Sequence, residues 1–356
     1  MDRNTHLRRV RGKRVFVGLS GGVDSAVSAA LLQQAGAHVT GVFIKGWYPP
    51  GMPCTWADDR RDAMRAAAHL RIPFRTLDAS GEYKEGVIDY LLREYKAGRT
   101  PNPDVMCNRE VKFGAFYRYA MAEGAEYIAT GHYAQIGEND EGVSLIRGVD
   151  AAKDQSYFLW AVPKNAISAT IFPVGGVPKA RVRELAAQFD LPNALKRDSQ
   201  GICFLGTISV EDFLRNEFGS EPGEAVDERG TRVGIHDGAV LHTLGERVRL
   251  EGAAAGPWYV LRKDIAKNLL VVAHERAAAG GAPLAVPLTE TNWLKTVRTD
   301  EPIEAQYRYH GPRISGTLDQ AANTFTPARP LTEPLASGQS LVAYRGDACL
   351  GGGIIG

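Results

Sequence analysis

A short segment near the start of the chain combines glycines, hydroxyls and a carboxylate at spacings suited to phosphate. It reads Gly18-Leu19-Ser20-Gly21-Gly22-Val23-Asp24-Ser25 and follows a run of apolar residues. Adjacent glycines let the backbone curl around an anion, and the amino end of a following helix adds partial positive charge. The segment has neither the Gly-Lys-Ser/Thr of a Walker A loop nor the pattern of a dinucleotide loop. It therefore predicts a phosphate-binding loop of another kind.

This octet resembles the pyrophosphate loop of the N-type ATP pyrophosphatases. The resemblance implies that ATP is cleaved between its α- and β-phosphates and that AMP passes to an oxygen of the substrate. It also implies Mg²⁺ on the nucleotide phosphates, because AMP transfer must neutralise developing charge. The loop does not indicate which nucleophile later displaces AMP.

The cysteines bear on that nucleophile. They are Cys54, Cys107, Cys203 and Cys349, and no two form a C-x-x-C pair. This excludes a zinc ribbon and a compact disulfide framework, and no metal-ligand set is predicted. Cys203 lies between Ile202 and Phe204, where a buried apolar cysteine is the alternative to a reactive one. Cys54 and Cys349 lack acid or base neighbours and are interpreted as structural.

Cys107 lies in a more suggestive segment, Asn102-Pro103-Asp104-Val105-Met106-Cys107. With Asp104 as a plausible N-cap, Cys107 falls at the third helical position, where the positive helix end favours the thiolate. Two roles stay open for Asp104, which are capping the helix and exchanging a proton with the thiol. Six basic residues against three acidic ones lie between residues 93 and 118. Such local positive charge suits phosphate, although a solvated helix face also shows it.

Strands and helices alternate through the first part of the chain. Strands are expected at 14–19, 38–44, 73–77 and 126–130, and helices at 24–35, 58–70, 82–96 and 110–124. This rhythm predicts an α/β fold, a doubly wound parallel sheet covered by helices on both faces. The phosphate loop then sits at the carboxyl edge of that sheet, where ligands bind.

The pattern changes after about residue 205, where short β-like runs appear at 240–244, 258–262, 268–273, 305–309 and 341–344. We expect a catalytic domain at 1–205, a small mixed central domain at 206–285 and a β-barrel-like domain at 286–356. The 356 residues carry 42 Lys and Arg against 41 Asp and Glu, a net charge of +1, which argues for a confined basic surface. The basic first fourteen residues have no apolar segment of a secretory signal, and no membrane span is expected. A cytoplasmic protein is predicted.

Over nearly its whole length the chain resembles the tRNA-specific 2-thiouridylases, which place sulfur on C2 of the wobble uridine. The most specific segments are Asn-Pro-Asp-x-x-Cys-Asn at 102–108 and Gly-Ile-Cys-Phe at 201–204. Further matches lie at 129–133, 153–158, 242–245, 338–340 and 349–353. Two departures are Ile44, where the family commonly has Met, and residues 246–250, which leave contacts of the central domain uncertain.

The resemblance assigns roles by position. It implies that Cys203 carries a persulfide, that Cys107 is the catalytic nucleophile and that the two can form a disulfide. Asn102, Pro103 and Asp104 would meet the target base. The implied ATP contacts are Gly18, Leu19, Ser20, Gly21, Gly22, Val23, Asp24, Ser25, Ile44 and Gly131. Other tRNA contacts would be His132, Lys153, Asp154, Gln155, Arg308, Tyr309 and Gln339.

The implied reaction transfers AMP to O2 of uridine and then moves sulfur from the Cys203 persulfide to C2. Sulfur would attack directly, or as sulfide released by Cys107, and a disulfide would remain to be reduced. The persulfide sulfur would come from a cysteine desulfurase or a sulfur-relay protein. Three alternatives remain, namely an amide- or C–N-bond-forming ligase of the same loop class, a tRNA-binding protein with a dead nucleotide site, and a thiolase for another tRNA nucleoside. A ligase would have no use for Cys107 and Cys203, and a tRNA-binding protein with a dead nucleotide site would not need these cysteines or an intact loop. The lack of C-x-x-C pairs counts against an iron–sulfur thiolase for another nucleoside.

Overall fold

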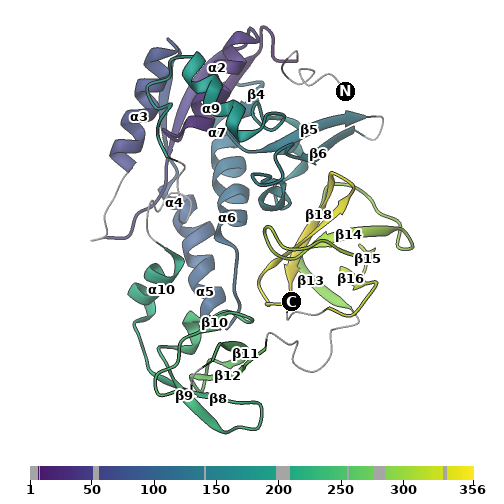
Figure 1. Cartoon of the computed structure of the whole chain (residues 1–356). Helices are drawn as coiled ribbons and strands as arrows, with labels where there is room; N and C mark the ends of the chain where they lie inside the picture. Colours follow the sequence, from purple (N-terminus) through teal and green to yellow (C-terminus); the bar gives the residue numbers. More distant parts are fainter. Residues whose placement is uncertain are drawn as a thin grey trace.

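The computed structural model describes residues 7, 9–50, 56–139, 142–197, 209–254, 256–275, 285–331 and 335–356. Within these residues the chain builds three sheets. Figure 1 shows the α/β part at the top, a small sheet at the bottom and a barrel at the right, with long helices running from the first sheet toward the small one.

The first sheet has the strand order β3-β2-β1-β4-β7, and every pairing in it is parallel. Val15 and Val17 of β1 pack into one apolar cluster while Phe16 between them packs into another, so both faces are covered. The doubly wound parallel sheet is thus confirmed. Its strands are β1 (Arg14–Gly18), β2 (His38–Lys45), β3 (Phe74–Asp78), β4 (Tyr127–Ala129) and β7 (Thr170–Ile171).

The expected helices are present, and two of them run longer and less regularly than the pattern indicates. Residues 80–96 and 103–122 each contain a π-helical stretch, a form that is rare and frequent at functional sites. The helical segments of this part are α2 (Val23–Gln34), α3 (Trp56–His69), α4 (Ser80–Tyr83), η1 (Lys84–Asp89), α5 (Tyr90–Lys96), α6 (Pro103–Met106), η2 (Cys107–Ala115), α7 (Phe116–Ala122), η3 (Ser156–Leu159), α8 (Lys164–Ser168) and α9 (Lys179–Gln188).

The last part of the chain forms a barrel, because β13 pairs with β16 on one side and with β18 on the other. A hairpin from the first part, β5 (Ala134–Asn139) with β6 (Gly142–Arg147), extends this sheet by pairing β6 with β18. The barrel strands are β13 (Val286–Trp293), β14 (Pro302–Gln306), β15 (Ile314–Asp319), β16 (Thr324–Pro327), β17 (Ser340–Arg345) and β18 (Ala348–Ile355).

The barrel docks on the first part through close backbone packing. The Cβ of a larger residue at Gly352 would lie 3.1 Å from Cδ2 of Trp160, which is fully buried. Asn292 of β13 donates its amide hydrogens to the carbonyl oxygens of Trp160 and Val162, at 2.7 and 3.0 Å. The joint therefore fixes the barrel relative to the α/β part.

The small sheet has the order β10-β11-β12-β8-β9 and mixes parallel and antiparallel pairs. The prediction of a strand at 240–244 is wrong, since residues 239–241 form a short 3₁₀ turn. The helix α10 was not predicted, because no helices were expected after residue 205. Its elements are α10 (Val210–Phe218), β8 (Gly223–Val226), β9 (Arg232–His236), η4 (Ala239–Leu241), β10 (Arg247–Val248), β11 (Trp258–Asp264) and β12 (Leu269–Ala273). Among the described residues, no helix is long and apolar enough to cross a bilayer.

Candidate active site

The phosphate loop turns between the end of β1 and the start of α2, as the sequence predicts. Gly21 has a φ of +79°, and a Cβ there would collide with the carbonyl oxygen of Asp59. The Ser20 N–H donates to the Ser25 hydroxyl at 3.2 Å, and that hydroxyl donates to the Gly22 carbonyl at 3.0 Å. The loop is thus a closed turn at the carboxyl edge of the sheet, facing outward with the amino end of α2.

Asp24, in the first turn of α2, is held by two groups from elsewhere in the chain. The Lys179 ammonium lies 2.7 and 2.8 Å from its two carboxylate oxygens, and the Tyr133 hydroxyl donates to it at 2.8 Å. The Lys179 side chain is 14% exposed. This cation offsets the carboxylate charge at a site where phosphates, also negative, would bind.

The two remaining residues assigned to ATP lie beside the loop. A Cβ at Gly131 would come within 2.7 Å of the backbone nitrogen of Ser25, so β4 ends directly against the start of α2. Ile44 is 6% exposed, and its side chain lies 3.9 Å from where a Cβ on Gly18 would be. The structure therefore brings the predicted ATP residues together at one edge of the sheet.

The helix that bears Cys107 begins differently from the prediction. Asn102, not Asp104, is the N-cap, and its side-chain oxygen accepts from the backbone N–H groups of Asp104 and Val105 at 3.1 and 3.4 Å. Because Pro103 is the first helical residue, Cys107 is the fifth rather than the third. Asn followed directly by Pro at the first helical position is a strong start signal, because Asn is a favoured N-cap and Pro needs no partner for an N–H there.

A cavity of about 410 Å³ opens at the start of this helix. Asn102, Pro103 and Asp104 line it, as does Gln339 from the barrel, and all four were assigned to the substrate. Tyr95 at the end of α5 and Ser209 before α10 line it too. Residues from the α/β part, the segment leading into the small sheet, and the barrel thus meet at one cavity.

Thr100 fixes the loop that enters this helix. Its N–H donates to the Ser337 carbonyl at 2.8 Å, and its own carbonyl accepts from the Gln339 amide at 2.7 Å. Its hydroxyl lies 3.4 Å from that of Thr243 in the small domain. Neither Thr100 nor Tyr95 was singled out from the sequence, since their contacts are with residues far along the chain.

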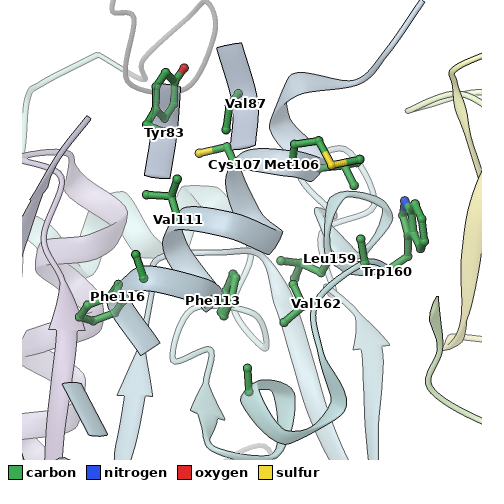
Figure 2. Packing of buried hydrophobic residues seen from close by; sticks show 14 of the residues in the cluster. Tyr83, Val87, Met106, Cys107, Val111, Phe113, Phe116, Leu159, Trp160 and Val162 are labelled. Carbon is green, nitrogen blue, oxygen red and sulfur yellow. The ribbon is translucent and has the colours of Figure 1, made fainter. Parts of the chain in front are cut away.

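Cys107 lies at the start of η2 within the largest apolar cluster and is 1% exposed. Figure 2 shows it beside Met106, facing the helix that carries Tyr83 and Val87. The predicted place of the thiol in the first helical turn is therefore wrong, because Cys107 lies beyond that turn, and its side chain is covered. Cys203 lies outside the described residues, and so does Cys54. Cys349 is fully buried, and burial raises its pKa to about 12, which fits a structural role.

Two of the residues assigned to tRNA contacts on the first part are buried and hydrogen-bonded. His132 is 7% exposed, and its Nδ1 pairs with the Thr130 hydroxyl at 2.8 Å. Burial, with the nearby Lys112 cation, holds the His132 pKa well below its ordinary value, so the ring is neutral. Asp154, also 7% exposed, accepts from the N–H groups of Gly148 and Ser156 at 2.9 and 3.1 Å.

The neighbours of Asp154 are more accessible. Lys153 and Gln155 are half-buried, and the side-chain oxygen Oε1 of Gln155 accepts from the Tyr133 N–H at 3.0 Å. Since Tyr133 also donates to Asp24, this loop and the phosphate loop share one tyrosine. Sequence reasoning did not identify Lys179 or Tyr133 as site residues. The one available signal was that Lys179 stands at the start of a helix.

Arg308 and Tyr309 follow β14 on the barrel. The Tyr309 ring lies 4.4 Å from that of Phe158, centroid to centroid, and the Arg308 guanidinium lies 5.9 Å from the Tyr307 ring. Burial raises the pKa of Tyr309, and the carboxylates of Asp154 and Asp104 raise it further. The Tyr309 ring is thus close enough to both carboxylates to feel their charge. The tRNA assignments themselves stay predictions.

The fold and site define a class: a doubly wound α/β domain with a pyrophosphate-type loop, joined to a small sheet and a barrel, with an open cavity lined by the α/β part, the start of α10 and the barrel. Family models match the chain in the same order. They are the tRNA methyl transferase HUP domain over residues 13–207, the tRNA methyl transferase PRC-barrel domain over 211–274 and the aminomethyltransferase beta-barrel domain over 285–355.

Two relatives illustrate the similarity, and both are named tRNA-specific 2-thiouridylase MnmA. The protein of Shouchella clausii is 40% identical over 356 residues, 98% of each chain, and that of Pseudomonas fluorescens is 42% identical over 96% of this chain and 94% of its own. The chain belongs to the tRNA-specific 2-thiouridylase family. Among solved structures, U34-tRNA thiolase NcsA from Methanococcus maripaludis shares 16% identity at a TM-score of 0.38, covering 61% of this chain and 72% of that one.

Proposed function

We propose that this protein uses ATP to replace O2 of the wobble uridine of tRNA with sulfur, giving 2-thiouridine, AMP and pyrophosphate. The observation that carries the proposal is the cavity of about 410 Å³ at the start of the helix bearing Cys107. Its size suits a single nucleotide, and Asn102, Asp104 and Gln339 give its wall hydrogen-bonding groups. A base that reacts at C2 must leave its stack and enter such a pocket.

The phosphate loop and its neighbours would perform the activation step. O2 of uridine attacks the α-phosphorus of ATP, the bond to the bridging oxygen breaks, and pyrophosphate leaves. The loop N–H groups and the amino end of α2 bind the phosphates, and Lys179 offsets Asp24 beside them. Uridine N3 loses its proton as O2 gains the AMP group.

Magnesium would assist that step by neutralising charge on the phosphates. In proteins Mg²⁺ is commonly held by substrate phosphates with one or two carboxylates. Asp24 is the carboxylate at the loop, and it is already paired with Lys179. Among the described residues no group of three or more His, Cys, Asp and Glu side chains could hold a metal ion. The donor set therefore fits an ion that arrives with ATP.

Sulfur transfer follows at C2. The outer sulfur of a Cys203 persulfide attacks C2, the bond from C2 to O2 breaks, and AMP leaves with the oxygen. The Cys107 thiolate then attacks the inner sulfur, so that the outer sulfur stays on C2 and a Cys107–Cys203 disulfide forms. If Cys107 attacks first, sulfide is released and itself attacks C2. In both orders a two-electron thiol reductant must reopen the disulfide.

Asp104 is assigned to proton transfer in this scheme. Asn102 caps the helix, so capping does not account for the carboxylate that follows. Asp104 lines the cavity and is half-buried, where a carboxylate can accept the uridine N3 proton and return it to the product. The partners of the reaction are therefore tRNA and a persulfide donor, a desulfurase or a sulfur-relay protein. A cytoplasmic location stays a prediction from the sequence.

The test incubates the full chain with unmodified tRNA, ATP, Mg²⁺, a sulfur donor and a thiol reductant, and then analyses the nucleosides. We expect 2-thiouridine, with AMP and pyrophosphate formed in step. C203S should form no 2-thiouridine yet still adenylate tRNA, and D24A should block ATP–pyrophosphate exchange because the loop is broken.

Three results would overturn the proposal. They are wild-type protein that leaves uridine unmodified, C203S that thiolates normally, and AMP formation that needs ammonia but no sulfur. The last would favour a ligase of the same loop class.

A further inference from the structure

Asn193 lies in the turn after α9, about 170 residues from the phosphate loop in sequence, yet it contacts that loop directly. Its side-chain nitrogen lies 2.9 Å from the Gly21 carbonyl oxygen and 3.1 Å from that of Gly22. Carbonyl oxygens only accept hydrogen bonds, so the amide nitrogen, not the amide oxygen, must face them. The residue is 6% exposed. A buried amide therefore donates to two successive carbonyl groups of the loop.

Two hydrogen bonds of this kind determine which way the loop peptides point. In a trans peptide the C=O and the following N–H point in opposite directions. With the Gly21 and Gly22 carbonyls turned toward Asn193, the N–H groups of Gly22 and Val23 are turned to the opposite side. An anion needs N–H groups, and a carbonyl oxygen in their place would repel it. Glycines rotate freely between the two orientations. The Gly22 carbonyl is also held from within the loop, by the Ser25 hydroxyl and by the N–H of Ala26. Asn193 adds a hold on that carbonyl and reaches the Gly21 carbonyl as well.

A second observation concerns the other end of the amide. Its oxygen is buried and has no hydrogen-bond partner among the described residues. A buried unpaired acceptor destabilises the fold, and an apolar side chain of similar size would avoid that loss. Among the described residues, the hydrogen bonds of this side chain are therefore the two to the loop carbonyls.

We infer that Asn193 is a positioning residue for the phosphate loop, which holds the Gly21 and Gly22 carbonyls away from the polyphosphate of ATP. The inference rests on the proposed function only in that the loop binds ATP phosphates. Asn193 acts through the loop backbone, so its loss should weaken the grip on phosphates and leave the adenosine part of the site unchanged.

The test compares ATP and adenosine binding to the full chain by calorimetry, in wild type, N193A and N193D. N193D keeps the shape but replaces the donor with a carboxylate that faces two carbonyl oxygens. We expect ATP to bind about tenfold more weakly to N193A, consistent with two lost hydrogen bonds, and more weakly still to N193D, with adenosine affinity unchanged in both. N165A removes an exposed asparagine on α8 and serves as the matched control.

Each outcome decides a different point. If wild-type protein fails to prefer ATP over adenosine, the loop assignment in the proposed function is wrong. If wild type shows the preference and N193A and N193D keep it, the role of Asn193 is wrong. Equal losses of ATP and adenosine affinity, together with a lowered melting temperature, would show a merely structural residue. N165A should match wild type throughout, and an equal loss of ATP affinity in N165A would also overturn the inference.

Discussion

At the scale of single residues, the most informative feature is the pair of charges beside the phosphate loop. Asp24 supplies a carboxylate where ATP phosphates are proposed to bind, and Lys179 pairs with both of its oxygens. The Lys179 ammonium therefore reduces the repulsion between the Asp24 carboxylate and the phosphates of ATP. The loop has no lysine of its own, and α9 brings one from elsewhere in the chain.

K179M should weaken ATP binding about tenfold or more, because it leaves the Asp24 charge unbalanced next to the phosphates. Binding of ATP and of adenosine by calorimetry would check this, and only ATP affinity should fall. K13M is the matched control, since Lys13 pairs with the exposed Glu126 at the opposite edge of the sheet. Unchanged or tighter ATP binding by K179M would contradict the expectation.

The two buried cysteines should differ in reactivity. Cys107 is 1% exposed at the start of a π-helical stretch, and Cys349 is fully buried with a pKa of about 12. The proposed chemistry requires Cys107 to become accessible when substrates bind, whereas Cys349 has no such role. We expect alkylation of Cys107 by iodoacetamide to be slow in the free protein and several-fold faster with ATP and tRNA, while Cys349 stays unmodified. Peptide mass spectrometry measures both sites, and a Cys107 rate that substrates leave unchanged would contradict this.

At the scale of elements, the start of α2 depends on how closely β4 approaches it. Gly131 follows β4, and a Cβ there would meet the backbone of Asp24 and Ser25 at 2.9 and 2.7 Å. Backbone atoms cannot move aside as a flexible side chain can. Close packing against α2 therefore requires a glycine at position 131, independently of the ATP contact that the resemblance assigns to it.

G131A should lower the free energy of unfolding by about 1–3 kcal/mol, the usual range for an overpacked site, and should also weaken ATP binding. Denaturant titration and calorimetry measure the two effects. Gly81 in α4 provides the control, because a Cβ there meets nothing within 4 Å and G81A should be neutral or slightly stabilising. A G131A protein as stable as wild type would show that the packing can relax.

The sequence predicts this α/β part well because its signals are local. Strands β1, β2 and β3 are each a short run with a helix after it, and four strands of the parallel sheet lie within a residue or two of the expected positions. The hairpin of β5 and β6 was missed since its partner, β18, lies about 200 residues further on. The helix cap was assigned to Asp104 instead of Asn102, and residues 239–241 were expected to be a strand instead of a 3₁₀ turn, because nearly equal local options compete at both places.

The candidate site shows the same division. The phosphate loop could be located from its spacing alone, because glycines and hydroxyls act within one turn. Lys179, Thr100 and Asn193 act across the fold, and a single sequence holds no signal that joins them to their partners. The contacts that complete the site are therefore the ones that only the structure reveals.

At the scale of the whole molecule, the small domain carries a titratable link near the cavity. His242 lies 2.8 Å from Asp237 and 3.1 Å from Glu246, and Glu246 accepts from the N–H of Thr243, whose hydroxyl approaches that of Thr100. Burial opposes protonation of His242, but these two carboxylates outweigh it and raise its pKa. The protonated ring thus helps hold the small domain in its place.

This predicts a pH dependence with a definite sign. A raised folded pKa means that the His242 contribution to stability is complete below the unfolded value near 6.5 and is lost as pH rises through the folded value. Stability of wild type should therefore fall relative to H242Q as pH rises from about 6 to 8. Denaturant titration at several pH values measures this. Burial lowers the pKa of Lys263 to about 8, so its titration acts mainly above that window. Parallel curves for the two proteins would contradict the link.

The contact between the end of β18 and residues 338–339 has a consequence for how the cavity is assembled. The backbone of Ile355, in the last strand, exchanges hydrogen bonds with Gly338 and Gln339, and Gln339 lines the cavity. The Gln339 wall of the cavity is therefore held by a strand that lies about 330 residues further along the chain than the phosphate loop. A variant that lacks β18 should keep its ATP binding and lose the cavity wall at which the proposed chemistry on tRNA takes place.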